Sequence, residues 1–566
     1  MGTYVGKRRR QKTLVQLLQH PDLLAASFFL LLVVVAAWPV LSHLDTVIAG
    51  DDIDVYINPW ADWWTQKALS DPALSLWQTD YMFYPQGADL SYHSFSHLNT
   101  ALSLLLRPFV GPLPAYNLTI LFNYFLIALA MYHFTRYWTG SAGAGLLAGI
   151  VFAFNSHSLY QSCHPVLLSI WTLPWTALFL LKAVDRNSLK WAAVAGFFVF
   201  LTALVSVLML ILLALWLAAL GLFMFATRRW RFSHWRLFAL FGLIGASLSL
   251  PVLFPLLREA LADGNGSFVV DPYASFVTDL ASPVTPHWIH WYIRGIYFGI
   301  MPGALLLLAA GRLRQTRFWF ALLLVSFLFA AGPRPTLDGE QLDLVLPWSL
   351  SLAPLLRNMY RLNIIVSLAL AVLVGYGWLV FARHLPRHRA VKGAALLLLA
   401  LFIFADYLQP TFPRTHLSTP RFYRQVLAHE PDDVAIAIVP SGRQYDKPHL
   451  YYQTIHGHKM VNGVVSRAPA VTGDFINNNP LLRAGFMDLP PAPFPDQPQR
   501  ALEALAAAGV DYLVVEKGWR DLDPEAWRAA LPGSPVYEDG QVLVYATHVA
   551  AAHSERPPLP PDYSGP

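Results

Sequence analysis

Three aspartates within five positions give this chain its clearest group of residues that could do acid–base chemistry. The stretch "GDDIDVYINPWADWW", residues 50 to 64, carries Asp51, Asp52 and Asp54 directly after a very apolar run. A carboxylate at a membrane surface can accept a proton from a hydroxyl group that attacks a lipid-linked carbon. Attack on one face of a sugar, with a phosphate departing from the other, inverts the anomeric centre. We therefore predict that Asp51 or Asp52 is a general base, and the alternative for both is a helix-cap or Asx-turn role.

Such a reaction needs positive charge where the phosphate leaves. In "APLLRNMYRLN", Arg357 and Arg361 are four residues apart, so they share one helical face. Arg294 lies on the same predicted side of the membrane. We expect these three arginines to bind a lipid phosphate, and the alternative is that they snorkel to phospholipid or pair with loop aspartates.

Histidines near the same predicted face are candidates for lining a substrate pocket. They are His157 and His164 in "NSHSLYQSCHP", and His287 and His290, with Trp288, in "SPVTPHWIHWYIRG". Paired histidines with no nearby acid form a polar rim more often than a metal site. The adjacent aspartates are better suited to Mg²⁺ or Mn²⁺, which prefer oxygen ligands, and the sequence leaves open whether they bind such an ion.

The three tryptophans after the aspartates predict a surface helix. Asn58 can cap a helix whose first turn begins at Pro59. Trp60, Trp63 and Trp64 then share one face, and we expect them to anchor the helix in the headgroup layer.

Composition says which elements must position these residues. The chain has 566 residues, of which 55% are hydrophobic and 13% charged, and its mean hydropathy is +0.42. These values are typical of an α-helical multispan membrane protein. The basic residues lie in short clusters between apolar runs, where topology explains them, so we predict no nucleic-acid partner. Cys163 is the single cysteine, which excludes an intrachain disulfide.

Apolar runs predict about eleven transmembrane helices. The first follows the basic residues 7 to 10, and we expect it to be a retained signal anchor rather than a cleaved signal peptide. The others are expected at 116 to 136, 141 to 155, 165 to 182, 190 to 205, 207 to 226, 236 to 256, 296 to 311, 317 to 332, 362 to 383 and 392 to 409.

The charge pattern predicts a multi-pass protein of the plasma (inner) membrane with a cytoplasmic N-terminus, because every second loop is basic. For the basic loops to alternate in this way, residues 97 to 114 must form a helix that dips into or lies along the outer interface rather than crossing the membrane. The outer loops would then be 45 to 96 and 257 to 295. The first of these contains eight aspartates and one lysine, Lys67, an imbalance that solubility alone does not require.

The predicted domains are a cytoplasmic N-terminus (1 to 12), a transmembrane domain (13 to 409), a small extracytoplasmic α/β domain (410 to 548) and a disordered proline-rich tail (549 to 566). In the α/β domain, we expect buried strands at 433 to 440 and 510 to 518, and a hairpin that turns at Asp539 and Gly540. Residues 498 to 509 have helical spacing and end at Gly509, a natural C-cap residue.

This organisation resembles the GT-C superfamily of integral-membrane glycosyltransferases. The resemblance is carried by "GDDIDVYINPWADWW", by the long loop at 257 to 295 and by the C-terminal domain. "MFYPQGADLSYHS" and "YYQTIHGHKMVNGVVSR" are also similar to a bacterial group of membrane proteins described as glycosyltransferases. The resemblance implies a polyprenyl-phosphate sugar donor, a base at Asp51 or Asp52, and a metal-binding or structural role for Asp54. It also implies phosphate binding by Arg357 and Arg361.

The leading hypothesis is an inverting glycosyltransferase that acts on an extracytoplasmic glycan, lipid or protein acceptor. One alternative is a transporter or flippase of lipid-linked glycan, which would be expected to carry ionisable residues near the bilayer midplane. The other is a non-catalytic membrane assembly factor whose C-terminal domain is the working part.

Overall fold

The computed structural model describes residues 20–91, 93, 95–262, 276–286, 295–348, 356, 358–408, 412–466, 473–490 and 492–548. The chain divides into two compact units. The helical unit comprises Met1–Asp51, Ser96–Phe254 and Val269–Thr415, and the sheet unit comprises Asp52–Phe95, Pro255–Phe268 and His416–Pro566. The predicted boundary near residue 410, between the transmembrane and the α/β domain, differs from this division in one respect. The loop that begins at Asp52 belongs to the same unit as the C-terminal segment.

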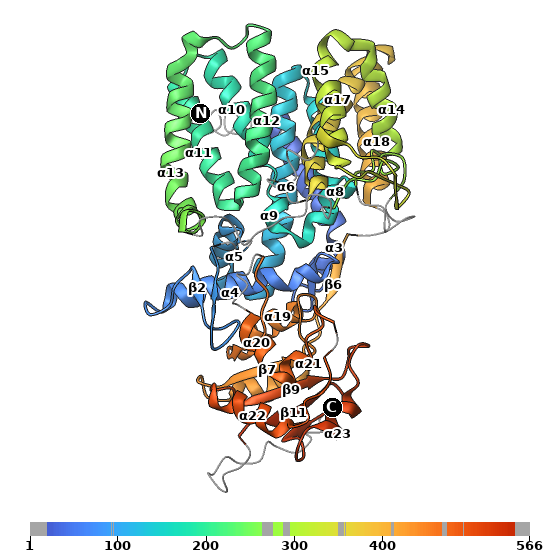
Figure 1. Cartoon of the computed structure of the whole chain (residues 1–566). Coiled ribbons are helices and arrows are strands. Elements are labelled where there is room, and N and C mark those ends of the chain that lie inside the picture. The colour runs from blue at the N-terminus through green and yellow to red at the C-terminus, as the bar shows by residue number, and fades with distance from the viewer. Residues whose placement is uncertain are drawn as a thin grey trace, which may run out of the picture. The chain divides into compact units, whose positions relative to one another are not determined.

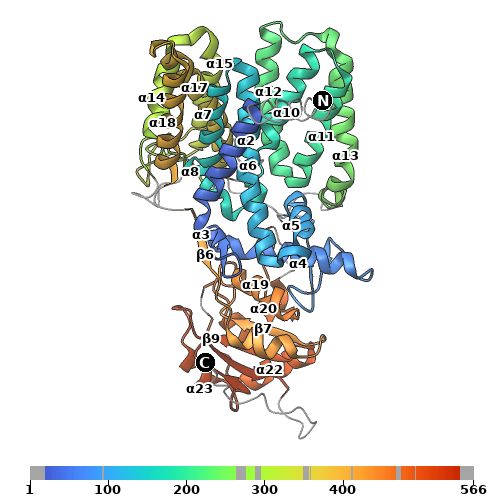
Figure 2. The ribbon, with the colours of Figure 1, turned by 180° about the vertical axis from the view of Figure 1, so that it is seen from behind.

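The helical unit is built from long apolar helices joined by short ones (Figures 1 and 2). Its helices are α2 Pro21–Ala36, α3 Trp38–Leu41, α5 His97–Val110, α6 Pro112–Thr139, α7 Ala142–Phe154, α8 Ser156–Tyr160, the 3-10 turn η2 Gln161–Cys163, α9 Pro165–Leu168, α10 Thr172–Asp185, α11 Leu189–Val205, α12 Val207–Ala226, α13 Trp235–Ala262, α14 Ile300–Ala309, α15 Leu313–Ala330, η7 Met359–Leu362, α17 Asn363–His384 and α18 Arg389–Leu408. Short strands β1 Val47–Ala49 and β6 Arg414–His416 pair with each other.

Among the described residues, seven helices are long and apolar enough to cross a membrane, or eight if the bent pair α7 and α8–η2 counts as one span. These are the features of a multi-pass membrane protein. The predicted number of eleven is not reproduced. The first predicted span is a 16-residue helix, α2, that ends before Pro39, and the two spans predicted at 296 to 311 and 317 to 332 form one run of 31 residues. Residues 97 to 110 form a separate 14-residue helix, α5, that is not among the seven.

Helix α17 lies at the centre of the helical unit, since residues 363 to 378 are buried on all sides. A helix that is apolar and buried all round is what a continuous hydrophobic run predicts for the core of a bundle. Its backbone closely approaches that of α14 at Gly377, where a Cβ atom would lie 2.0 Å from the Leu305 carbonyl oxygen. Small residues permit this kind of close helix crossing in membranes.

The long apolar run from 190 to 226 is divided at Ser206, as the predicted spans require. Its backbone is extended there, and the Ser206 hydroxyl accepts a hydrogen bond from the backbone N–H of Met209, which caps α12.

The sheet unit contains a five-stranded mixed sheet with the order β10–β11–β9–β7–β8. Strands β7 and β9 are parallel, and β9, β11 and β10 are successively antiparallel. The strands are β7 Ala435–Val439, β8 Lys459–Met460, β9 Tyr512–Glu516, β10 Tyr537–Glu538 and β11 Val542–Ala546; the helices are η1 Ile53–Tyr56, α4 Ile57–Ser70, η8 Phe422–Val426, η9 Leu427–His429, α19 Asp446–His456, α20 Asp474–Asn478, α21 Pro480–Ala484, α22 Pro498–Ala507 and α23 Pro524–Ala530; β2 Gln78–Thr79 pairs with β3 Ala88–Asp89.

The predicted strands, helix and hairpin of this region are confirmed. Strands β7 and β9 lie within the two predicted runs, and every residue in them is buried. The Asp539 carboxylate accepts hydrogen bonds from the backbone of Gln541 and Val542, which closes the hairpin. Gly509 follows α22 with a φ of +79°, a conformation that favours glycine.

The two faces of the sheet bury different segments. Because side chains alternate along a strand, Ile436 and Ile438 point to one face while Ala437 and Val439 point to the other. The first face is covered by α4 and α19, and the second by α21, α22 and α23. Residues 52 to 95 therefore complete one half of the core of this unit.

Candidate functional site

Asp51 follows a strand that is clamped to the helical unit. The Asn117 side chain, at the start of α6, accepts from Ala49 N at 2.9 Å and donates to Val47 O at 2.7 Å. On the other side, Gly50 N donates to Pro413 O at 2.9 Å. Gly50 has a φ of +112°, so the chain turns there as only glycine does readily. These bonds fix the position of Asp51, which is exposed at the end of the clamp.

The Asp51 carboxylate interacts electrostatically with the phenol of Tyr124, a buried residue of α6. The Tyr124 hydroxyl donates to the Ser158 carbonyl oxygen on α8 at 2.9 Å. Its ring packs edge-on against Phe412 at 5.3 Å. Tyr124 therefore connects the aspartate to the bent helix pair α7 and α8–η2. Figures 1 and 2 place α3, α8 and β6 at the same end of the helix bundle.

The bend after α7 is built by polar side chains. Asn155 donates to the carbonyl oxygens of Val151 and Phe152 at 2.9 and 3.0 Å, and its own oxygen accepts from Ser158 N at 3.1 Å. An Asn at this position ends α7 and caps α8 at once. The short helix that results presents His157, Tyr160 and the residues of η2.

The structure brings His157, His164 and the segment of Arg361 together. The rings of His157 and Tyr360 are 5.9 Å apart, and those of Tyr160 and Tyr360 are 6.4 Å apart. The His164 ring is 6.0 Å from Tyr160, and its Nδ1 lies 3.0 Å from Cys163 Sγ.

Arg361 follows Tyr360 directly in η7, and its Nη1 donates to the Leu356 carbonyl at 2.5 Å. The other predicted candidates, Arg294, Arg357, His287, Trp288 and His290, lie outside the described residues.

Asp52 and Asp54 have structural partners in the sheet unit. The Asp52 carboxylate caps η1 by accepting from Asp54 N at 3.0 Å, which is the alternative role that the sequence allowed. Asp54 Oδ1 lies 2.6 Å from Lys447 Nζ, and the lysine side chain is 5% exposed. No group of three His, Cys, Asp or Glu side chains that could hold a metal is found in the described part of the chain. The binding of Mg²⁺ or Mn²⁺ by the aspartates thus stays a prediction, and the positions of Asp52 and Asp54 do not support it.

The tryptophan helix differs from the prediction. Trp60 and Trp64 are fully buried and stacked at 5.9 Å in the core of the sheet unit, so the expectation that they anchor the chain in the headgroup layer is wrong. Trp60 Nε1 donates to Gln453 Oε1 at 2.6 Å, a partner 393 residues away. Trp63 is partly buried against the same core. The helix also begins at Ile57 without a cap from Asn58, because η1 runs directly into α4.

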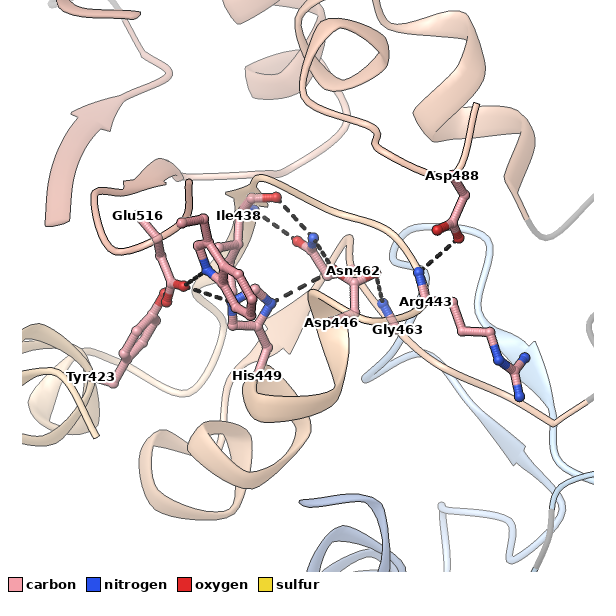
Figure 3. A network of polar contacts seen from close by, with 10 residues as sticks. Tyr423, Ile438, Arg443, Asp446, His449, Asn462, Gly463, Asp488 and Glu516 are labelled. Atoms are coloured by element: carbon pink, nitrogen blue, oxygen red, sulfur yellow. Dashed lines mark hydrogen bonds and ion pairs between the residues drawn. The ribbon is translucent and has the colours of Figure 1, made fainter. Parts of the chain in front are cut away.

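Helix α19, which carries Lys447 and Gln453, is held by a buried charge network (Figure 3). His449 Nε2 lies 3.2 Å from Glu516 Oε2, and Nδ1 lies 3.6 Å from Asp446 Oδ1; neither contact has hydrogen-bond geometry, so both are ion pairs. Burial by itself would lower the pKa of His449, but Glu516 and Asp446 outweigh it and raise the pKa to about 9. Tyr423 and Trp519 donate to Glu516 at 2.9 and 2.8 Å.

Pairing and burial act differently on the two carboxyl groups. Burial would raise the pKa of Glu516, but the charge of His449 and the hydrogen bonds outweigh burial and lower that pKa. For Asp446, burial is the larger effect and the pKa is raised, although His449 and Asn462 oppose it. We therefore infer an imidazolium of His449 at neutral pH between two acidic side chains.

Sequence reasoning missed Asn117, Tyr124 and Gln161. Asn117 and Tyr124 lie inside a predicted span, where a polar residue on an apolar helix was the available signal. Gln161 stands between two predicted histidine candidates and is 1% exposed, which the sequence did not indicate.

No protein-family model and no curated protein matches the chain. Among solved structures, the chain superposes on ArnT from Cupriavidus metallidurans in the apo state with a TM-score of 0.52 and 13% identity, over 94% of this chain and 100% of that chain. It superposes on the arabinofuranosyltransferase AftD from Mycobacteria with a TM-score of 0.51 and 16% identity, over 93% of this chain and 41% of AftD. An oligosaccharyltransferase from Archaeoglobus fulgidus, in a complex with Zn and sulfate, gives a TM-score of 0.44 and 14% identity, over 88% of this chain and 68% of that chain.

Proposed function

The chain shares the fold of the GT-C membrane glycosyltransferases, and on that premise we propose that it transfers a sugar from a polyprenyl-phosphate carrier with inversion, using Asp51 as general base. The acceptor is an extracytoplasmic glycan, lipid or protein. The membrane is the plasma membrane, with the N-terminus in the cytoplasm and the C-terminal segment outside.

One observation carries the choice of Asp51 over its neighbours. Asp52 caps η1 and Asp54 pairs with Lys447, so each has a structural task in the sheet unit. Asp51 is exposed at the end of a clamped strand of the helical unit, and its carboxylate interacts with Tyr124. A base must be held rigidly and still reach its substrate, and the Asn117 clamp supports both requirements.

In the proposed reaction, the acceptor hydroxyl oxygen forms a bond to the anomeric carbon while its proton passes to the Asp51 carboxylate. The bond between that carbon and the phosphate oxygen breaks, and polyprenyl phosphate leaves with the electron pair. Arg361 stabilises the phosphate as its charge develops, from a segment that adjoins Tyr360 and His157. His157 and His164 line the donor side. No step of this reaction is assigned to a metal ion.

The test compares two adjacent aspartates. Asn is as good a helix N-cap as Asp, so D52N keeps the structural role of Asp52 while removing its charge. We expect D51N to lower transfer by about 10²–10⁴-fold, the usual contribution of a general base, and D52N to retain most of it.

The measurement is mass analysis of surface glycans in a strain that lacks the protein and is complemented with each variant, followed by release of polyprenyl phosphate by purified protein. The exposed Asp45 supplies a second control as D45N, which should behave as wild type. Full transfer by D51N would remove the assignment of the base. Glycans unchanged by loss of the whole protein would remove the proposed function.

A further inference from the structure

Gln161 is a buried side chain whose polar atoms lack a partner. It is 1% exposed, and neither its Nε2 nor its Oε1 is hydrogen-bonded to any described residue. His157, which is 2% exposed, has an unpartnered Nε2. The contrast with Asn155 and Ser158 on the same segment is informative, because both of those side chains are hydrogen-bonded within the bend. The bend therefore uses Asn155 and Ser158, but leaves Gln161, the Nε2 atom of His157 and the hydroxyl of Ser162 without a partner among the described residues.

Gln161 and His157 lie together. Gln161 N donates to the His157 carbonyl oxygen, so the residues are one helical turn apart and present their side chains on the same face. The rings of Tyr160 and Tyr360 flank this turn, and Tyr360 is 5.9 Å from His157. Ser158, between them in sequence, accepts the hydrogen bond from Tyr124, the residue that interacts with Asp51. The unpartnered groups are thus connected to the proposed base through one tyrosine.

Buried polar groups in native proteins are nearly always hydrogen-bonded, because leaving them unpaired costs the full penalty of desolvation. A carboxamide offers an acceptor oxygen and an NH₂ donor about 2 Å apart, in one plane. Two adjacent hydroxyl groups match that pair, one donating to Oε1 and the other accepting from Nε2. Aromatic rings beside the amide suit the apolar C–H faces of a sugar ring.

We propose that Gln161, together with His157, binds two adjacent hydroxyl groups of the transferred sugar and so determines which sugar is accepted. This inference rests on the proposed function, since it assigns the donor's sugar to the polar end of the helical unit. Its ligand class is a neutral sugar with vicinal hydroxyls. A sugar that lacks either hydroxyl leaves one end of the buried amide unpaired and is rejected, as sites built to hydrogen-bond a hydroxyl group reject analogues without it.

Binding tests the inference without requiring transfer. The full chain in lipid nanodiscs is titrated with a panel of polyprenyl-phosphate hexoses and pentoses, and separately with unglycosylated polyprenyl phosphate. For the tightest donor, we expect Q161L to weaken binding roughly ten- to hundredfold, the loss of two hydrogen bonds. Affinity for the unglycosylated lipid should not change. Q315L, at an exposed glutamine of the same unit, is the matched control and should bind as wild type.

A second arm begins with wild type, so its first measurement does not depend on a variant that must fold. Donors deoxygenated at single positions are titrated against wild type, and two adjacent positions should each weaken binding. In Q161L those two deoxy donors should bind like the parent donor, which is the coupling expected of direct contacts. If Q161L binds every donor as wild type does, or if no pair of adjacent hydroxyls matters, the amide is satisfied by water or serves folding only, and the inference is overturned. Discrimination between donors by wild type without any transfer would instead overturn the proposed function and leave this inference standing.

Discussion

The buried His449 makes the stability of α19 depend on pH, and the direction follows from its pKa. His449 has a folded-state pKa of about 9, above the value of 6.5 for an unperturbed histidine. A group with a raised pKa contributes stability that is fully present below its unfolded value and is lost as pH rises through its folded value. The window for loss is therefore pH 6.5 to about 9.

The magnitude follows from the same pair of values. At 1.36 kcal/mol for each tenfold change in proton affinity, a rise from 6.5 to about 9 corresponds to about 3 kcal/mol. Other histidines near this helix contribute little in that window. Burial lowers the pKa of both His456 and His458, so both are neutral throughout it. Tyr423 and Tyr452 are neutral there too, because burial raises the pKa of each.

Hydrogen exchange of the purified full chain measures this effect locally. Peptides that cover Asp446–His456 are followed at several pH values between 6.5 and 9.5, after correction for the intrinsic exchange rate, with peptides of α17 as reference. We expect the opening free energy of α19 to fall by about 3 kcal/mol across this range, with no matching change in α17. H449Q should be less stable at pH 6.5, because it leaves two buried acidic groups without their cation, and its stability should be nearly independent of pH.

An exposed histidine supplies the control. H416Q removes an imidazole outside this network and should leave the pH dependence of α19 as in wild type. If wild-type α19 exchanges with the same opening free energy at pH 6.5 and 9.5, the imidazolium between Glu516 and Asp446 does not exist. An equal pH dependence in H449Q would assign the effect to a different group.

Two further changes test the clamp on Asp51 and the docking of the first loop. N117L removes three hydrogen bonds to the backbone of residues 44 to 49. We expect sugar transfer to fall toward that of D51N, which glycan analysis measures. We also expect the free energy of unfolding to fall by about 1–3 kcal/mol for each buried backbone group left unpaired, which thermal unfolding measures. G463A places a Cβ atom 2.9 Å from Met82 Cβ. We expect this clash to destabilise the protein by about 1–3 kcal/mol and to speed proteolysis of residues 78 to 90. G518A is the control and should behave as wild type, because the space around Gly518 is open.

The sequence predicted the elements whose signals are local. Strands β7 and β9 were visible as short apolar runs between turn residues, and the hairpin at Asp539 followed from the Asp-Gly pair. The end of one predicted span and the start of the next met at Ser206, which is the residue that caps α12. Spans that are bent or interrupted were miscounted, because hydropathy reports length and polarity but not the direction of a helix axis.

The sequence could not predict contacts between distant segments. A face of three tryptophans is equally suited to a headgroup layer and to a protein core, and the choice depends on Gln453 and the sheet, nearly 400 residues away. The same holds for Asn117, whose partners lie about 70 residues earlier in the chain. The adjacent aspartates could be told apart only after the fold had assigned Asp52 to a helix cap.

The acidity of the first loop is balanced by a segment far along the chain. Residues 81 to 84 run beside β8, where Tyr84 N donates to Met460 O at 2.9 Å and Met460 N donates to Tyr81 O at 3.1 Å. The stretches around Met82 and around Met460, which resemble a bacterial group of membrane proteins, therefore pack against each other. This contact is a structural reason for the residues that the two stretches contain.

The same packing supplies the missing positive charge. Lys447 pairs with Asp54, and Lys459 pairs with Asp80, so two lysines of the C-terminal segment neutralise two acids of a loop that holds one lysine of its own. The Asp52 carboxylate instead accepts a hydrogen bond from the backbone N–H of Asp54. Packing and one local hydrogen bond thus explain three of these aspartates without any chemistry. Asp51 is proposed as the base on other grounds, because it is exposed at the end of the strand that Asn117 holds and it interacts with Tyr124.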